Sequence, residues 1–407
     1  MESAESDQDS ERCQASGDTF RSIWYILEIL YLWLGNNLFE NWTTNPVENP
    51  VRRYNVSTGS NSDSESPKGN HRMPPVAPNV LQDADPAVAT HVESPSSRTV
   101  KTVPSASRVP VAAEVRMGRE ANYGGINWVT AGFIGAFHIG AIAALFYFSW
   151  SRLAVALVLW VLAINVGIGV CYHRLLTHRG FQTPKWIEYC MTVCATLALE
   201  GGPIFWVAVH RVHHQHSDQT GDPHTPKEGP WWAHIGWMVL GKSMHAKTSA
   251  LARYVPDLAR DRFHVWMSKY HWVSLVACGA VLFGLGSWID HSMMGGLKMV
   301  LWGVFLRVTL GLHATWLVNS ATHLWGSRRF ETRDDSRNSF WVALVTGGEG
   351  WHNNHHAHPV SAKHGLAWYE VDPNFYILWL LSKLGLARKI QVARYDKANP
   401  KPAGAAH

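Results

Sequence analysis

Apolar and polar residues are distributed very unevenly along this chain, and four long apolar runs stand out. Residues 126–149 and 153–172 contain no Asp, Glu, Lys or Arg, and each is long enough to cross about 30 Å of hydrocarbon as a helix. Only three residues separate these two runs, so they predict a tight hairpin. Residues 271–289 and 297–318 predict a second hairpin, joined by a loop that contains Asp290. The pattern therefore predicts an all-α membrane protein with four transmembrane helices in two hairpins.

The fourth run carries Arg307 near its middle. A charged side chain is costly in lipid, so we expect Arg307 to face the protein interior. The alternative interpretation is a pair of buried helical hairpins in a soluble all-α domain.

The polar regions 173–270 and 319–407 hold most of the Lys and Arg of the body, whereas the loops within the hairpins hold almost none. This asymmetry predicts that both regions lie on the cytoplasmic side of the membrane. Two spans separate them, and an even number of spans returns the chain to the same face. The two regions can therefore build one cytoplasmic helical cap. Residues 186–199 and 375–386 predict helices that lie on the membrane surface.

Residues 1–120 are rich in Ser, Pro, Asn and Asp and predict a disordered N-terminal extension. One segment in it, residues 23–34, is apolar on nearly every face. It is short for a span, so it predicts either an interfacial helix or a membrane anchor. Residues 391–407 are expected to form a C-terminal tail.

Composition excludes several classes of protein. Charged residues make up 16% of the chain, against about 25% in ordinary soluble domains, which argues against a coiled coil or a highly charged nucleic-acid binder. Residues 1–120 contain 11 Lys and Arg against 16 Asp and Glu, and the remainder contains 25 against 15, so an acidic head precedes a basic body. The five cysteines include no Cys-x-x-Cys pair, so a disulfide framework or a thiolate zinc site is not expected.

Histidine carries the strongest chemical signal, because 21 of the 23 histidines follow residue 120 and several form tight clusters. Three boxes and one further histidine after the fourth apolar run supply nine candidate metal ligands: His173, His178, His210, His213, His214, His323, His352, His355 and His356.

The spacing of these boxes indicates two metals. On a helix, residues 210, 213 and 214 fall within an arc of about 100°, and residues 352, 355 and 356 repeat that pattern. Adjacent rings such as His213 and His214 diverge by about 100°, as expected if each serves a different metal. A single zinc needs only three or four ligands. Asn319, one turn before His323, could orient a metal-bound water or have a simple capping or packing role.

Imidazole binds iron, copper, nickel and zinc, so the ligands alone do not name the metal. The setting favours iron. The site lies at the mouth of a membrane domain where aliphatic substrates are available, and inert C–H bonds require an oxygen-activating metal.

These residues resemble the membrane-bound fatty acid desaturases of the acyl-CoA Δ9 type. The resemblance covers about residues 121–390 and includes Asn319-Ser-Ala-Thr-His323, Asp222-Pro223-His224 and Gly348-Glu349-Gly350. The stretches around Trp186 and Gly201-Gly-Pro-Ile-Phe-Trp206 are most similar to the plant and bacterial branch.

The resemblance implies a cytoplasmic cap that holds two Fe²⁺ ions on the nine histidines, with a water held by Asn319. It also implies insertion of a cis double bond at C9–C10 of a saturated C16–C18 acyl chain, for unsaturated fatty acid biosynthesis. Trp206, Thr315 and the adjacent Trp316 match the region that lines the substrate tunnel. Members of the family use O2 and two external electrons, supplied by a donor such as cytochrome b5 or a ferredoxin.

Two departures leave the acyl carrier open between CoA and a lipid. Animal members have an Arg-Asp pair before the second box, where this chain has Ala208-Val209, and a basic pair where it has Lys227-Glu228. Arg174, Lys185 and Lys227 are candidates for contact with a substrate head group or lipid phosphate. The expected location is the endoplasmic reticulum or a bacterial inner membrane, with the catalytic face in the cytoplasm and no nucleic-acid partner.

Two other functions are considered. A di-iron membrane hydroxylase or ketolase shares the histidine boxes, and analysis of the product would distinguish it. A non-enzymatic metal-binding or transport protein predicts no dependence on O2. The remaining histidines near the boxes are expected to be structural: His216, His224, His234, His358 and His364.

Overall fold

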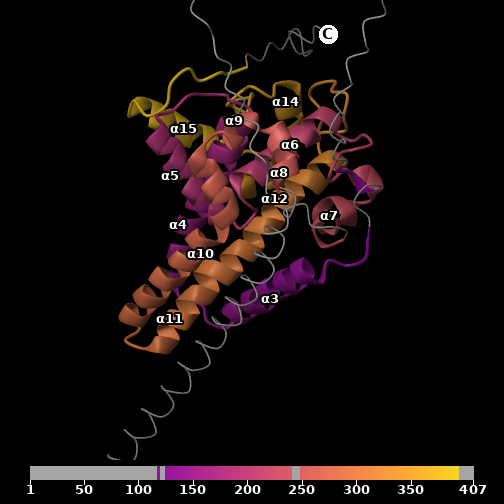
Figure 1. Ribbon diagram of the computed structural model, residues 1–407. Coiled ribbons are helices and arrows are strands. Elements are labelled where there is room, and N and C mark those ends of the chain that lie inside the picture. Colours follow the sequence, from indigo (N-terminus) through magenta and orange to yellow (C-terminus); the bar gives the residue numbers. More distant parts are fainter. Residues whose placement is uncertain (1–116, 120–123, 241–247, 394–407) are drawn as a thin grey trace, which may run out of the picture. The chain divides into compact units, whose positions relative to one another are not determined.

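The computed structural model describes residues 117–119, 124–240 and 248–393 (Figure 1). The predicted disordered extension apart from residues 117–119, its apolar segment 23–34 and nearly all of the predicted tail lie outside the described residues. Within the described part the chain is helical, and its β-structure is confined to isolated bridges such as Gln182 with Arg388. The predicted all-α fold is therefore confirmed.

Among the residues that the structure describes, four helices are long and apolar enough to cross a membrane, as predicted. The first is α3 (Trp128–Leu145). The second consists of α4 (Trp150–Trp160) and the wider, π-type helix η1 (Val161–Thr177). The third is α10 (Arg262–Ile289), and the fourth is the continuous run of α11 (Met293–Val300), η6 (Leu301–Leu306) and α12 (Arg307–Leu324).

The helices differ from the predicted spans at their ends. The turn of the first hairpin lies at residues 146–149, because the Ser149 side chain accepts a hydrogen bond from Arg152 N and starts α4 at Trp150. At the other end of the spans, η1, α10 and α12 run beyond their apolar stretches. The additional turns of η1 and α12 carry His173 and His323 into the cap.

The spans leave much of their apolar surface exposed. Only 28% of the apolar window of α3 and 17% of that of α10 is buried inside the protein. Ile139 on α3 and Val281 on α10 are 71% and 69% exposed. Apolar surface of this extent needs a nonpolar solvent, so these faces fit a lipid environment.

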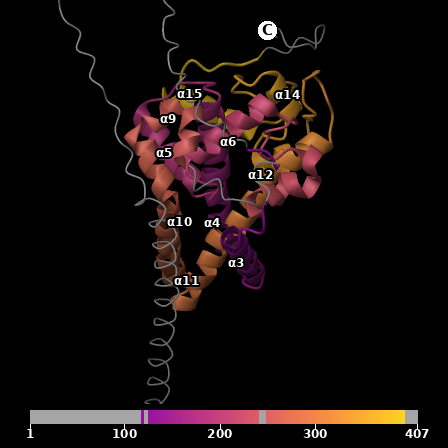
Figure 2. The same ribbon diagram turned by 45° about the vertical axis from the view of Figure 1, so that its right-hand side comes forward.

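The second hairpin is held by close backbone contact. Helices α10 and α11 lie side by side in both views (Figures 1 and 2). A methyl group added at Gly286 would lie 2.5 Å from the Gly295 carbonyl oxygen, so only glycine permits this approach. An ion pair between Arg152 and Asp290 joins the two hairpins.

Arg307 is 2% exposed, which confirms that it faces the interior. Its Nε donates to the Gly303 carbonyl oxygen at 3.1 Å, and its Nη1 donates to the Leu197 carbonyl oxygen at 2.6 Å. Leu197 is the C-cap of α5 (Lys185–Thr196), and a cation stabilises that end of a helix. The buried charge therefore fastens α5 to the fourth span.

The cap gathers at one end of the spans. Helices α5, α6 (Pro203–His216), α14 (His352–Ala357) and α15 (Pro373–Lys383) lie there in both views, and α5, α6 and α15 pack on η1 (Figure 2). Helices α5 and α15 coincide with the two predicted surface helices, and both expose large side chains such as Trp186 and Trp379.

Three histidines outside the boxes link α3, α12 and the short π-type helix η3 (Trp232–Gly236). His313 Nε2 lies 2.9 Å from His138 Nε2, and His313 Nδ1 lies 3.0 Å from His234 Nε2. This chain of contacts gives His234 the structural role expected from the sequence and fixes η3 against the spans.

Candidate metal centre

Four segments of the cap bring the nine box histidines together. His173 and His178 lie at the end of η1, the second box lies on α6, His323 lies on the last turn of α12, and the third box forms α14. They fall into two groups in which the candidate ligand atoms lie within 4.8 Å of one another. The five-histidine group contains His173, His178, His210, His214 and His355, and the four-histidine group contains His213, His323, His352 and His356.

Nitrogen atoms face one another across both groups. In the five-histidine group His355 Nε2 lies 3.1 Å from His173 Nε2 and 2.9 Å from His214 Nε2, which lies 3.1 Å from His210 Nε2. In the four-histidine group His352 Nε2 lies 3.0 Å from His323 Nε2. The groups adjoin where the His214 and His356 rings stack with centroids 4.6 Å apart.

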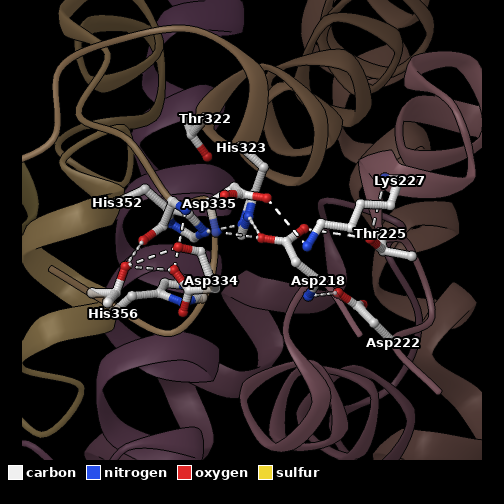
Figure 3. A network of polar contacts seen from close by, with 12 residues as sticks. Asp218, Asp222, Thr225, Lys227, Thr322, His323, Asp334, Asp335, His352 and His356 are labelled. Atoms are coloured by element: carbon white, nitrogen blue, oxygen red, sulfur yellow. Dashed lines mark hydrogen bonds and ion pairs between the residues drawn. The ribbon is translucent and has the colours of Figure 1, made fainter. Parts of the chain in front are cut away.

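A carboxylate backs one histidine of the five-histidine group and three of the four-histidine group. Glu349 contacts His173 Nδ1, and Asp222 lies 3.1 Å from His213 Nδ1. Asp218 lies 2.7 Å from His323 Nδ1, and Asp334 lies 2.8 Å from His356 Nδ1 (Figure 3). An ionised carboxylate accepts but cannot donate, so each of these rings holds its proton on Nδ1 and turns the Nε2 lone pair into the group.

This arrangement suits a bound cation. Where both Nε2 atoms of such a pair carry a lone pair, they cannot satisfy each other, whereas a metal between them satisfies both. Buried nitrogen atoms without a hydrogen-bond partner include His178 Nε2 and His356 Nε2. Imidazoles whose other nitrogen donates to a carboxylate are the usual form of a histidine metal ligand. The donor set therefore fits two metal ions, one in each group.

The electrostatics of the site favour the neutral form of several imidazoles and the ionised form of the Glu349 carboxylate. Burial lowers the pKa of His178, His210 and His355 well below the ordinary histidine value, and neighbouring histidines add to the effect. Burial opposes ionisation of Glu349, but Arg174 and then His173 hold its pKa well below the usual range. A deprotonated imidazole nitrogen is the form that binds a metal.

Arg174 corrects one prediction. The sequence made it a candidate for a substrate head group, but its side chain is fully buried. It pairs with Glu349 and Asp372, each at 2.9 Å, and donates to the Ala362 carbonyl oxygen. A buried arginine must be paired, and these partners occupy it. Arg174 therefore holds the carboxylate that positions His173.

A second polar cluster lies beside the five-histidine group. The Trp206 ring stacks on His210 with centroids 5.1 Å apart. Trp206 Nε1 donates to Glu200 at 2.9 Å, and Thr315 Oγ1 donates to Glu200 at 2.7 Å. Burial raises the pKa of Glu200 to about 7, although the two hydrogen bonds oppose this shift. The predicted tunnel residues Trp206 and Thr315 are thus joined through one buried carboxyl group.

The other predicted site residues are spread more widely. Trp316 is buried, and its ring contacts those of His234 and His313. Asn319 is half-buried on α12, four residues before His323. Lys185 is exposed and pairs with Glu188 and Asp261, and exposed Lys227 pairs with Asp335 at 3.3 Å. Their functional roles stay predictions.

Sequence reasoning missed three acidic residues of the site: Glu200, Asp218 and Asp334. Asp222 and Glu349 stood out only as parts of motifs. The general rule that histidine ligands donate to carboxylates would have directed attention to acids near the boxes. It would not have found Asp334, because 21 residues separate it from His356 along the chain.

Comparison with known proteins adds the family context. The profile of the family described as fatty acid desaturase matches residues 127–387. The chain is 46% identical over 270 residues to the sn-1 stearoyl-lipid 9-desaturase of Anabaena variabilis, covering 66% of this chain and 95% of that protein. It is 41% identical over 255 residues to Delta-9 acyl-lipid desaturase 2 of Arabidopsis thaliana, covering 63% and 80%. It is 38% identical over 260 residues to the acyl-CoA C20 Delta5-desaturase of Anemone leveillei, covering 64% and 80%.

Proposed function

The chain belongs to the fatty acid desaturase family, and we propose that it inserts a cis double bond at C9–C10 of saturated C16–C18 acyl chains. One observation carries the proposal most directly. Two groups of buried imidazoles, four of them backed by carboxylates, lie at the end of four helices long enough to cross a membrane.

The nine histidines would hold two iron ions, five on one and four on the other. When bound, two Fe²⁺ ions supply the reduction of O2 that removes two hydrogens from inert C–H bonds. The overall reaction converts a saturated chain, O2, two electrons and two protons into an alkene and two waters. The role of this chain's own residues is to fix the ligands and to align one C–C bond with the centre.

The carboxylates fix the ligands. Each holds an Nδ1 proton in place, so the ring cannot rotate or change tautomer without losing a charge-assisted hydrogen bond. Glu349 is itself fixed by Arg174, whose Nη2 donates to it at 2.9 Å. We expect Asn319 to orient a water near His323, which is consistent with their positions on α12.

The Trp206–Glu200–Thr315 cluster would align the substrate. It ties α6 to α12 beside His210, so an acyl chain that contacts Trp206 and Thr315 keeps a fixed distance from the five-histidine group. A shift of one carbon along an acyl chain moves the reacting bond by only about 1.3 Å, and catalysis is sensitive to misplacement of about 1 Å. A tunnel wall that this cluster holds rigid would therefore restrict the reaction to one C–C bond of the acyl chain.

The acyl carrier is proposed to be a membrane lipid rather than CoA. The relatives from Anabaena variabilis and Arabidopsis thaliana are named for lipid substrates, and this chain lacks both charged pairs expected for CoA. Lys185 is a better head-group candidate than Lys227, because it starts α5 beside the exposed Trp186. The cap is proposed to face the cytoplasm, in the endoplasmic reticulum or a bacterial inner membrane, and to receive electrons from an external donor.

The decisive experiment expresses the full chain in a host that lacks its own Δ9 desaturase. We expect growth without added unsaturated fatty acid and a new C9–C10 double bond located by mass spectrometry. Each of the variants His213→Ala and His355→Ala removes one ligand from a different group, and both should abolish the product. Retained activity in either variant would contradict the ligand assignment, and a hydroxylated chain would favour the hydroxylase alternative.

A further inference from the structure

The segment between α12 and α13 (Phe340–Thr346) touches both histidine groups. We call residues 325–339 the arginine loop, because it carries Arg328, Arg329, Arg333 and Arg337. Three consecutive residues make the contacts. Arg333 Nη2 donates to the His214 carbonyl oxygen at 3.4 Å, the Asp334 carboxylate contacts His356, and the Asp335 amide donates to Asp218 at 2.8 Å.

These contacts link the arginine loop to the centre in very few steps. From Asp334 a single hydrogen bond reaches the His356 ring, and from the Asp335 amide two hydrogen bonds through Asp218 reach the His323 ring. Figure 3 shows these inward contacts of Asp334 and Asp335. Arg333 reaches the backbone of His214, whose ring stacks on His356 where the two groups adjoin.

The outer side of the arginine loop presents cations. Arg333 is exposed, and Lys227, from the neighbouring 3-10 helix η2 (Pro226–Glu228), has a side chain that is 60% exposed. Arg328 turns back onto the loop, where it pairs with Asp335 and donates to the Asp334 carbonyl oxygen. The Asp334 carboxylate, in contrast, is buried against His356. Trp325, at the start of the loop, is 66% exposed. Exposed cations attract an acidic protein, and an exposed aromatic side chain on the same loop can then hold it.

We propose that the arginine loop, together with Lys227, is the docking surface for an acidic one-electron carrier protein. This inference rests on the proposed function, because the reaction consumes two external electrons per double bond. Each docking event oxidises one carrier by one electron and adds that electron to the metal centre. Two docking events supply two electrons. Together with two protons from solution and the two hydrogens removed from the acyl chain, these electrons reduce O2 to two waters.

The first test measures binding, which does not require turnover. The probe is the oxidised soluble domain of an acidic cytochrome b5, titrated against the full chain in lipid nanodiscs. Lys227→Glu and Arg333→Glu should each raise the Kd about three- to tenfold at low salt, and the difference should shrink at high salt. The matched control is Arg388→Glu, an equal change of charge at an exposed residue whose backbone pairs with Gln182 ahead of α5.

The result that overturns the proposal is an unchanged Kd in both variants, or an equal rise in Arg388→Glu. If Arg333→Glu loses bound metal, its Kd is not informative and Lys227→Glu alone tests the docking surface. Lys227 lies outside the loop, and its ion pair with Asp335 is at the surface. Zero-length carbodiimide cross-linking gives an independent readout. Lys227 should join to a carboxylate of the carrier, and the absence of Lys227 from every cross-linked peptide would also count against docking here.

The two proposals fail in different ways. Absence of any new double bond in the wild-type chain, with carrier and iron supplied, contradicts the proposed function. A wild-type chain that desaturates lipids while the loop variants keep the wild-type Kd and the wild-type KM for the carrier contradicts only the docking surface. Reduction of the centre by dithionite, which needs no docking, should proceed at the same rate in Lys227→Glu as in wild type.

Discussion

Glu200 is the buried carboxyl group whose protonation the surroundings control most clearly. It accepts hydrogen bonds from Trp206 and Thr315, and burial raises its pKa from 4.5 to about 7. In the unfolded chain the group ionises near 4.5, so between these values only the unfolded state is ionised. The free energy of unfolding therefore falls as the pH rises through this window and stays low above pH 7.

We predict that Glu200→Gln removes this pH dependence. The amide keeps a carbonyl oxygen for Trp206 Nε1 and can donate to Thr315, so both tunnel residues stay in place. Above pH 7 the variant should be more stable than wild type by about 1–3 kcal/mol, with little difference at pH 4.5. Thermal unfolding in detergent at several pH values measures this. A wild-type protein whose stability is flat across the window would contradict the prediction.

The carboxylates behind the histidines determine which nitrogen of each ring is free to bind a metal. Asp222 keeps a pKa well below its usual range although burial opposes ionisation, because His213 and His224 lie beside it. Its pairing with His213 fixes one nitrogen of the ring as a donor and leaves the other as a ligand. An imidazole becomes a well-defined metal ligand only when such a partner holds it.

The packing of the α10–α11 hairpin requires glycine at position 286 of α10 but not at position 284. A methyl group at Gly286 would lie 2.5 Å from Gly295 O and 2.5 Å from Met299 Cβ, whereas one at Gly284 meets nothing within 4 Å. Gly286→Ala must therefore separate the two helices, while Gly284→Ala adds a methyl group on the open side of the same helix.

We predict that Gly286→Ala destabilises the protein by about 1–3 kcal/mol, as overpacking usually does. The matched variant Gly284→Ala should change stability by less than about 1 kcal/mol and can raise it, since alanine favours helix. The midpoint of thermal unfolding compares the two. Equal effects of both substitutions would show that the close contact at Gly286 does not limit the packing.

At the scale of the whole molecule, the metal ions should act as the link between segments distant in sequence. Their proposed ligands come from η1, α6, α12 and α14, so each metal would hold together segments that are far apart along the chain. Anything that binds only the folded state stabilises it. The cap should therefore be less stable after the metals are removed.

We predict that chelation lowers the Tm of the full chain by about 5–10 °C and that restoring Fe²⁺ reverses the change. The shift should shrink in His352→Ala, which removes a ligand from one group. It should vanish in the double variant His352→Ala with His355→Ala, which removes a ligand from both. A shift of the same size in the double variant would mean that the stabilising metal binds elsewhere.

The four spans, the inward orientation of Arg307 and the choice of candidate ligands could all be predicted from the amino-acid sequence. Each follows from a local signal: the length of an apolar run, the cost of a charge in lipid, or the spacing of histidines on one helix. The head-group prediction for Arg174 was wrong because its charge had two possible explanations. Arg174 had the charge expected of a head-group ligand, and only its burial between Glu349 and Asp372 revealed the structural role.

The sequence could not predict which histidines share a group or which acids support them, because these depend on how the helices pack. His213 and His214 are adjacent in sequence yet lie in different groups, and Asp334 reaches His356 across 21 intervening residues. The hydrogen bonds that Trp206 and Thr315 donate to Glu200 likewise connect three segments of the chain. The physical reason is common to all three cases. Hydrogen bonds and metal ligation act over about 3 Å in space, and the packing of helices sets those distances independently of separation along the chain.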